Sequence, residues 1–280
     1  MKNDIFVCMC GRFVQIIDID LFVKRFGVNR PKDRIIESNY NVAPGDMAYV
    51  ITNDKPDELQ TFRFGLTPSW AKKPMYLINA RAEGDFNPQN EISYSGENGI
   101  VQKPAFRTAI RSQRCLVIAN AFYEGPAKEK LSKPYLIQRI DEEVFSFAGI
   151  WDTWVNDQTG EVTNTFSVIT TVANEATQQI GHPRSPVILN KKDEKRWLDL
   201  DLPIEKVLEL LKPFPGDLLK TEAVSIQVKD PKNKNRDLMI PIDENKVTQY
   251  DITAKKSLRL EGMGSGKRKQ DPPEKQGKLF

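Results

Sequence analysis

Stretches in which apolar and polar residues alternate outnumber helical patterns along this chain. Strand-like runs fall at residues 47–52, 59–66, 115–123, 135–140, 144–151, 165–172 and 218–228. They are rich in Val, Ile, Thr and aromatic residues, which suit a pleated and half-buried surface. The sequence therefore predicts a protein built mainly of β-strands.

Helical patterns are short and lie between these runs. Residues 18–27 predict an amphipathic helix that ends at Gly27, and further helices are predicted at 176–180, 191–200 and 203–211. The last of these has Pro203 in its first turn, where proline is tolerated. Strands and helices do not alternate regularly, and no internal repeat is present. We therefore expect an α+β fold with a mainly antiparallel curved sheet or barrel and peripheral helices.

The ends of the chain differ in character from its middle. Residues 251–280 include the run KRKQDPPEKQG, which is too polar and too rich in Pro and Gly to bury a core. We predict a disordered basic tail at 251–280, a folded domain at 10–250, and a leader or a wrongly assigned start at 1–9. Within the domain, residues 67–106 carry few regular signals, which is typical of a functional or flexible segment.

Composition narrows the class of protein. The 280 residues are 39% hydrophobic and 28% charged, as in soluble globular proteins, and no apolar run is long enough to cross a bilayer. We expect a cytoplasmic, monomeric protein. A single histidine argues against a zinc centre, and Cys8, Cys10 and Cys115 do not form a disulfide framework.

Positive charge is concentrated in the tail. Residues 254–280 hold eight lysines and arginines against three acidic residues, so the rest of the chain has about −2 of the total charge of +3. A nucleic-acid contact in the folded domain would therefore need a local basic patch.

Cys10 stands in an unusual context, Met9-Cys10-Gly11-Arg12. A cysteine in a strand is most often a small buried apolar residue. If translation began at Met9, however, removal of that methionine would leave Cys10 with a free α-amine beside its thiol. These groups titrate near ~8 and ~8.5, so both are partly nucleophilic at neutral pH. Together they can trap an aldehyde as an imine and close it to a five-membered thiazolidine.

Three polar segments are further candidates for a site. LINARAEG places Asn79, Arg81 and Glu83 on one face of an extended chain, although such a segment can also be a polar strand edge. NAFYEGP delivers Glu124 at the end of an apolar run, where a half-buried carboxylate can act as a general acid or base. IGHPRSPVIL places His182 and Arg184 in a loop bounded by prolines. Taken alone, a lone histidine in a loop is more often structural than catalytic.

These motifs occur in a characteristic order: MCGRF, YNVAPG, FGLTPSWA, INARAE, RCLVIANAFYE and GHPRSPVIL. The set resembles the SRAP family (SOS response-associated peptidase) over roughly residues 9 to 230. The resemblance implies a β-rich fold that recognises abasic sites in single-stranded DNA during the response to DNA damage. It also implies a covalent thiazolidine cross-link with lyase-type character and a proposed self-cleaving peptidase activity, without a metal or cofactor.

The resemblance also assigns roles to individual residues. Cys10 matches the nucleophile, Asn79 the asparagine that orients it, Glu124 the carboxylate that shuttles protons, and His182 the histidine beside the opened sugar. A second set matches DNA-binding positions, with arginines for phosphates and an apolar wedge for bases. This set comprises Arg12, Asn41, Pro44, Trp70, Arg81 and Arg184.

Several positions depart from the family pattern. Gly125 stands where a tryptophan usually follows the glutamate, Asn120-Ala121 replaces Asp-Gly, and Pro183 makes the histidine loop more rigid. The residues before Cys10 are the largest departure, because Lys2 is too large for removal of Met1. Either Met9 is the true start, which we favour, or the protein removes residues 1–9 itself. Competition from the Cys8 thiol is a third reading, which the motif disfavours because it continues from Cys10.

Two questions stay open at the level of sequence. The main alternative to DNA capture is a cysteine peptidase that acts on itself or on other chains, and a further alternative is a non-covalent single-strand binder. The last five residues, QGKLF, resemble the short peptides that dock on the replication sliding clamp, through Gln276, Leu279 and Phe280. A clamp contact would place the protein at the nucleoid. The alternative to clamp docking is an ordinary solvated tail.

Overall fold

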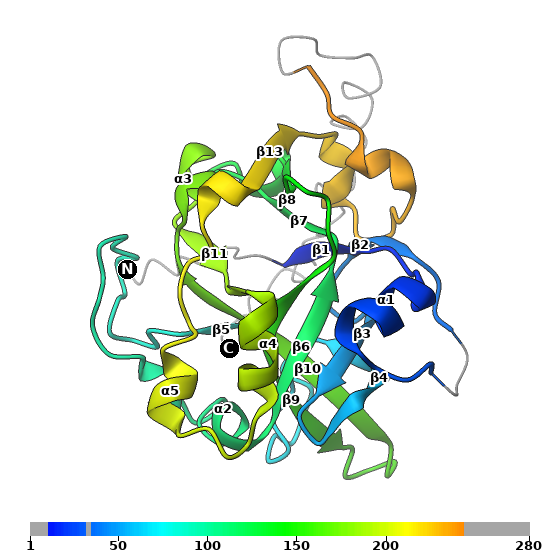
Figure 1. The fold of residues 1–280 in the computed structure, drawn as a ribbon, viewed down its shortest axis with the longest axis vertical. Helices are drawn as coiled ribbons and strands as arrows, with labels where there is room; N and C mark the ends of the chain where they lie inside the picture. The colour runs from blue at the N-terminus through cyan, green and yellow to red at the C-terminus, as the bar shows by residue number, and fades with distance from the viewer. Residues whose placement is uncertain (1–10, 32–34, 244–280) are drawn as a thin grey trace, which may run out of the picture.

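The computed structural model describes residues 11–31 and 35–243, and Figure 1 shows their arrangement. Cys10, the segment 1–9, the tail 251–280 and its last residues Gln276, Leu279 and Phe280 lie outside the described residues. The predictions made for them are therefore not addressed by the fold.

A closed five-stranded barrel forms the centre of the molecule. Its strands are β3 (Met47–Thr52), β4 (Lys55–Phe64), β6 (Arg114–Ala119), β9 (Phe145–Val155) and β10 (Val162–Val172), as Figure 1 shows. They pair in the order β10-β4-β3-β6-β9, and the pairing of β9 with β10 closes the ring. Every pair in the ring is antiparallel except β4 with β10. The predicted β-rich, mainly antiparallel barrel is confirmed.

Short strands extend the barrel where the site is built. The strands β5 (Asn79–Arg81) and β11 (Arg184–Pro186) both pair with β10, and β12 (Ile188–Leu189) pairs with β9. Because Thr170 pairs with residues of both β5 and β11, these two strands flank β10 on opposite edges, although they are far apart in the sequence.

A second sheet packs beside the barrel. It contains β1 (Arg12–Gln15), β2 (Asn39–Val42), β7 (Ala121–Glu124), β8 (Tyr135–Arg139) and β13 (Leu219–Ala223), in the antiparallel order β13-β8-β7-β1-β2. The single strand predicted at 115–123 is wrong, because the chain leaves the barrel at Asn120 and enters the second sheet. The Asn120 side chain accepts a hydrogen bond from Ile16 N (2.7 Å), and its N–H donates to Val14 O (2.9 Å). These bonds attach the point where the chain crosses between the sheets to Val14 of β1 and to Ile16 just after it.

Among the described residues, four helices pack on the core outside the barrel: α1 (Ile19–Phe26), α2 (Ala109–Ser112), α4 (Lys191–Leu198) and α5 (Ile204–Leu208). The helix α3 (Glu175–Gln179) packs instead against the core that the barrel shares with the second sheet. The predicted helix at 18–27 is confirmed: Asp18 accepts from Leu21 N at 2.9 Å, and Gly27 ends it with φ +70°. Pro203 is the residue that precedes α5 and does not lie in its first turn.

Between the regular elements, the described residues form the 3₁₀ turns η1 (Gly99–Gln102), η2 (Lys130–Ser132), η3 (Gly216–Leu218), η4 (Ile226–Lys229) and η5 (Arg236–Met239). The strand predicted at 218–228 is half wrong, since its second half forms η4. Ser225 caps this turn by accepting a hydrogen bond from Gln227 N, so the strand pairing stops at Ala223.

Alternation along the barrel strands separates two cores. One set of side chains, including Val50, Val117, Phe64 and Phe166, comes from the barrel strands and continues to Phe13 of the second sheet. The rings of Phe64 and Phe166 stack at 5.2 Å, and Phe13 meets Phe64 edge-on at 5.5 Å. The other set packs under the helices around Trp197. None of the described helices has the length and apolar character that a bilayer crossing requires.

Candidate functional site

Glu124 and His182 form a buried pair at the junction of the two sheets. Glu124 ends β7, and His182 follows α3, where its N–H donates to Thr177 O at 2.9 Å. The imidazole Nε2 lies 3.4 Å from Glu124 Oε1, and the two residues are only 2% and 4% exposed. The structure thus brings together two of the four residues predicted to be catalytic.

The backbone of Arg184 fixes the orientation of the His182 ring. Nδ1 lies 2.9 Å from the carbonyl oxygen of Arg184 and 3.4 Å from Arg184 N, so either tautomer of the imidazole has a partner there. Nε2 faces the carboxylate of Glu124. An imidazole and a carboxylate in this position can act as an acid–base pair.

A second buried pair, Glu83 with Arg184, supports the histidine loop. Arg184 Nη2 lies 2.8 Å from Glu83 Oε2 and donates to Thr170 O at 2.9 Å, while Thr171 Oγ1 donates to Glu83 Oε1 at 3.0 Å. Arg184 is 0% exposed. Its Nη2 is therefore occupied within the protein, while Nε and Nη1 have no hydrogen-bond partner among the described residues. The backbone carbonyl of Arg184 orients His182. The predicted phosphate contact of Arg184 stays a prediction.

Asn79 and Arg81 lie on β5, one strand away from Arg184. They flank the buried Ala80 and so share one face of the strand, as predicted. Glu83 does not continue that face, because the strand ends at Arg81 and the chain turns. Burial lowers the pKa of Arg81, and the positive charge of Arg184 lowers it further, against the opposing effects of Glu83 and Asp85. Arg81 therefore belongs to the same electrostatic cluster as Arg184.

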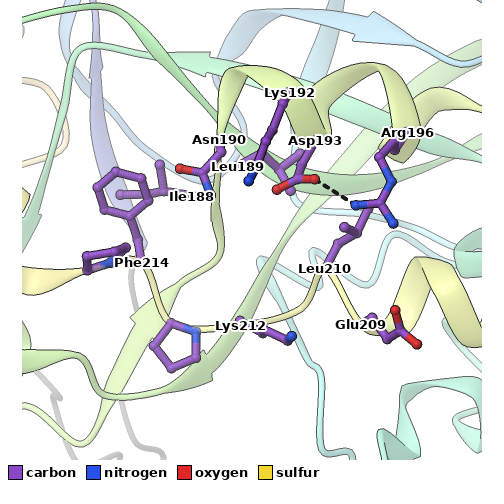
Figure 2. A pocket seen from close by; sticks show the side chains of 12 residues that line it. Ile188, Leu189, Asn190, Lys192, Asp193, Arg196, Glu209, Leu210, Lys212 and Phe214 are labelled. Carbon is purple, nitrogen blue, oxygen red and sulfur yellow. Dashed lines mark hydrogen bonds and ion pairs between the residues drawn. The ribbon is translucent and has the colours of Figure 1, made fainter.

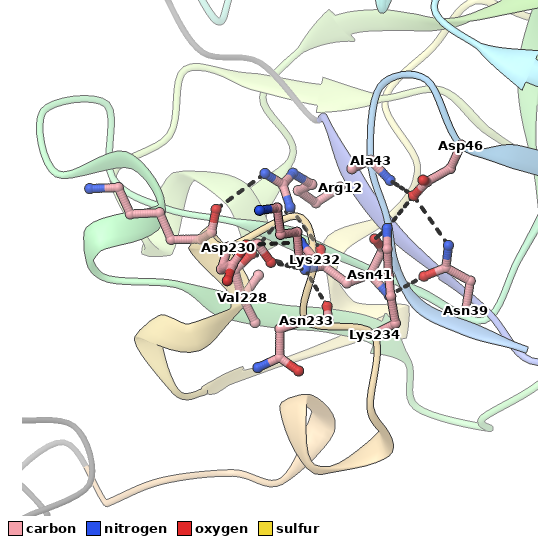
Figure 3. Close-up of polar contacts among 11 residues, drawn as sticks. Arg12, Asn39, Asn41, Ala43, Asp46, Val228, Asp230, Lys232, Asn233 and Lys234 are labelled. Atoms are coloured by element: carbon pink, nitrogen blue, oxygen red, sulfur yellow. Dashed lines mark hydrogen bonds and ion pairs between the residues drawn. The ribbon is translucent and has the colours of Figure 1, made fainter. Parts of the chain in front are cut away.

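Arg12 and Asn41 lie in a separate network that ties the two ends of the domain together (Figure 3). Arg12 Nη1 donates to Asn41 Oδ1 at 3.1 Å and to Val228 O at 3.3 Å. Asn41 is 0% exposed, and its Nδ2 lies within hydrogen-bonding distance of three carbonyl oxygens, those of Val228, Asp230 and Asn233. Asn41 therefore works as a clamp inside the protein, and its predicted contact with DNA stays a prediction.

Lys234 extends this network to the YNVAPG turn. Its Nζ donates to Asn41 O at 2.7 Å and contacts Asp46 Oδ2, which also accepts from Ala43 N at 2.8 Å (Figure 3). The turn itself is closed by a bond from Asp46 N to Ala43 O (3.0 Å), with Gly45 at φ +96°. Pro44 is exposed at its tip.

Trp70 is exposed on the loop that follows β4. Its side chain is 61% exposed, and Tyr76 on the same loop is 47% exposed. The neighbouring backbone is held firmly, because Trp154 Nε1 donates to Ala71 O at 2.6 Å and Ser69 N donates to Asp152 Oδ2 at 2.7 Å. An exposed indole on an anchored loop suits stacking against a base. The YNVAPG turn and this loop leave the β3–β4 pair at the same end, since Met47 pairs with Arg63.

Gly125 stands where the family pattern usually has a tryptophan, and its lack of a side chain allows a loop to pack over the end of β7. A side chain on Gly125 would overlap the carbonyl oxygen of Lys130, so residues 126–133 fold back over this position. The loop then reaches the histidine segment, where Ala127 N donates to Gly181 O at 3.1 Å. Gly125 N itself donates to Glu124 Oε1 at 3.2 Å.

Two hollows lie away from these residues. One of about 210 Å³ lies between the start of α4 and the chain after α5, beside Lys192, Lys212 and Phe214 (Figure 2). A larger one of about 520 Å³ runs along β4 and is lined by Arg30, Lys55 and Gln60, among others. Neither hollow contains a residue predicted for the site. Within the ranges 11–31 and 35–243, no group of three or more His, Cys, Asp or Glu side chains could hold a metal ion.

Sequence reasoning missed the partners that hold the site. Glu83 was noted only as a third polar position, and Thr171, 88 residues away in the sequence, carried no signal. Their association follows from the pairing of β10 with both β5 and β11, which no local pattern reveals. The third cysteine, Cys115, is buried in β6, and burial raises the pKa of its thiol well above the ordinary value.

Comparison with known proteins identifies the family of this chain. The family model described as "SOS response associated peptidase (SRAP)" matches residues 9–231. Abasic site processing protein YoqW of Bacillus subtilis is 34% identical over 239 residues, which cover 82% of this chain and 99% of that protein. Abasic site processing protein HMCES of Gallus gallus is 26% identical, over 76% of this chain and 68% of that protein.

A solved structure is similar as well. A protein from Bacteroides thetaiotaomicron, determined by X-ray crystallography, superposes with a TM-score of 0.70 at 28% identity, over 84% of this chain and 100% of that one. The family match covers most of the chain, including β1, β5, β7 and β11. The chain therefore belongs to the SOS response associated peptidase (SRAP) family.

Proposed function

We propose that this protein processes abasic sites in single-stranded DNA and captures them covalently through Cys10, as a thiazolidine. The names of its relatives, abasic site processing proteins, support the substrate. The observation that carries the proposal is the buried Glu124–His182 pair, 3.4 Å apart, at the end of the strand that pairs with β1.

The strand register relates Cys10 to this pair. Arg12 pairs with Tyr123 in the β1–β7 ladder, so the start of β1 lies beside the end of β7, where Glu124 follows. Cys10 precedes Arg12 by two residues, and two residues of chain span at most about 7 Å. This register supports the proposal that Cys10 acts beside the acid–base pair.

The chemistry needs proton transfers and no redox step. The ring-closed sugar loses a proton from its C1 hydroxyl and gains one on its ring oxygen, which opens it to an aldehyde. The α-amine of Cys10 adds to that carbonyl carbon, and loss of one water gives an imine. The thiolate then adds to the same carbon while the imine nitrogen takes up a proton, which closes the ring. Glu124 and His182 can supply and accept these protons in turn.

The surroundings fit a single strand that is splayed at the lesion. Trp70 and Pro44 are exposed at one end of the β3–β4 pair, where an apolar wedge can separate neighbouring bases. Arg81 belongs to the buried charge cluster beside β10 and is proposed to hold a phosphate. Asn79, on the same face of β5, is proposed to orient the cysteine and the sugar.

The amine of Cys10 must be free for this reaction. A start at Met9 followed by methionine removal would expose it, and so would self-cleavage after Met9. The word "peptidase" in the family description favours keeping the second route as a candidate activity. In that route the Cys10 thiol would be the nucleophile, and the Glu124–His182 pair would move the protons.

The C-terminal residues suggest where the reaction takes place. We propose that Gln276, Leu279 and Phe280 dock on the sliding clamp, which would bring the protein to newly exposed single strands in the nucleoid. Deletion of Leu279-Phe280 should abolish clamp capture while cross-linking to abasic DNA continues. Clamp binding that survives this deletion would contradict the docking role.

Covalent capture can be tested with single-stranded DNA that carries one abasic site. Protein that begins at Cys10 should give a shifted band on a denaturing gel, and Cys10→Ala should not. Cys8→Ala, made in the chain that begins at Met1, is the matched control and should process and cross-link as that chain does. A band of equal intensity with Cys10→Ala would overturn the proposal, and cleavage of unrelated peptides would favour the protease.

A further inference from the structure

The flank of the site carries a group of lysines that the function described so far does not use. The loop over Gly125 and the segment after β13 meet there, since Lys229 Nζ donates to Ser132 Oγ at 3.2 Å. Residues 125–134 contain three lysines and one glutamate, and residues 225–236 contain four basic residues and one aspartate. The folded domain, whose net charge is slightly negative, thus has a local basic surface here.

Three of these side chains, Lys128, Lys229 and Lys232, are exposed and are called the basic ridge below. Among the described residues, none of the three forms an ion pair with a carboxylate, whereas Lys206, Lys191 and Lys220 elsewhere on the surface do. Unpaired, clustered lysines repel one another. Such a cluster costs stability unless a polyanion neutralises it.

The backbone beneath the ridge is held in place. Asn41 clamps the carbonyl groups of Val228, Asp230 and Asn233, and Arg12 donates to Lys229 O at 3.2 Å (Figure 3). On the other side, the loop packs over Gly125 and bonds to Gly181 beside His182. The ridge therefore has a fixed position next to both the start of β1 and the acid–base pair.

We propose that the basic ridge binds the phosphates of the DNA strand on one side of the abasic nucleotide. This inference rests on the proposed function and adds a contact surface to it, outside the arginines assigned from the family motifs. Charge complementarity and continuity with the site favour a single strand over an acidic protein. Gly125 brings Lys128 to this surface, because only a residue without a side chain lets the loop 126–133 fold over this position.

The test is the salt dependence of binding to a fluorescent single-stranded oligonucleotide with one abasic site, using Cys10→Ala to keep binding reversible. Each phosphate contact contributes about 0.7 to the slope of log affinity against log salt. Replacing Lys128, Lys229 and Lys232 by alanine should lower the slope by about two. Replacement by arginine should leave it unchanged. The matched control replaces the exposed Lys24, Lys195 and Lys212 by alanine. These lysines belong to α1, α4 and the segment after α5, and this variant should keep the full slope.

The outcomes separate this inference from the proposed function. If the parent protein binds the oligonucleotide but both alanine triples show the same slope, the ridge does not contact DNA. If an acidic protein competes for the ridge and DNA does not, the same conclusion follows. If the parent protein does not bind abasic DNA at all, the proposed function itself fails. Thermal unfolding of each triple confirms that a changed slope comes from charge and not from misfolding.

Discussion

Two buried pairs of polar side chains stand next to each other in the site, and they differ in what they can do. Glu124 and His182 can exchange a proton, because a carboxyl group and an imidazole can each give and accept one. Glu83 and Arg184 cannot, since a guanidinium keeps its charge. The first pair is therefore suited to chemistry, and the second holds the histidine loop against β10.

Glu124→Gln tests the first pair. The amide keeps the shape of the side chain but cannot give or take a proton, so cross-link formation should slow by about 10²-fold. The measurement is the rate of the shifted band under single-turnover conditions with saturating DNA. Glu129→Gln, in the exposed loop nearby, is the control and should react at the normal rate. A normal rate for Glu124→Gln would remove the carboxylate from the mechanism.

Arg184→Met tests the second pair. Breaking a buried ion pair leaves Glu83 with an uncompensated charge, which should lower the free energy of unfolding by about 3–5 kcal/mol. Lys206→Met breaks the exposed pair with Glu209, which solvent screens, and should leave the free energy of unfolding nearly unchanged. Denaturant unfolding measures both. Adding Glu83→Gln to Arg184→Met should recover part of the loss, and a loss that simply adds would contradict the pairing.

At the scale of elements, the segment 228–235 fastens the C-terminal end of the domain to its N-terminal strands. Asn41 on β2 joins it to Arg12 on β1, and Lys234 joins it to the Pro44 turn. Lys234 lies just beyond the family match, which ends at 231. The position of the wedge and of β1 therefore depends on a segment at the edge of the family domain.

Asn41→Ala should weaken this attachment. It leaves the carbonyl groups of Val228, Asp230 and Asn233 without their shared donor in a buried place, at a cost of about 3 kcal/mol in unfolding free energy. Amide hydrogen exchange should also rise over residues 225–235. Asn235→Ala removes the exposed cap of η5 and an exposed hydrogen bond to Asn233 Oδ1, and should cost about 1 kcal/mol. Equal losses for the two variants would show that Asn41 is no clamp.

Local signals in the sequence predict where helices and strands lie, but they do not predict which distant segments these elements contact. Asp18 and Gly27 predict the two ends of α1, because helix caps depend on hydrogen bonds between residues close in the sequence. The break at Asn120 was missed, since it depends on hydrogen bonds with the distant segment 14–16. For the same reason the motifs named Glu124 and His182, but only the fold shows that Glu83 holds Arg184, and that Asn41 faces inward.

At the scale of the molecule, the closed barrel provides a rigid support, and the site is assembled at its junction with the second sheet. Strand β10 carries β5 and β11, and strand β7 carries β1 (Figure 1). Four segments that are distant in the sequence thus meet where a single strand of DNA is proposed to bind. The lysines of the basic ridge lie at the edge of this site and add positive charge to it.

The most direct test of this proposal is the intact mass of the cross-linked complex formed by mature protein from its own host. A thiazolidine at Cys10 predicts residues 10–280 plus the abasic oligonucleotide minus one water. It also predicts that a variant which retains Met9 still binds the DNA but forms no stable cross-link. A cross-linked species that still carries residues before Cys10 would contradict capture by a terminal cysteine.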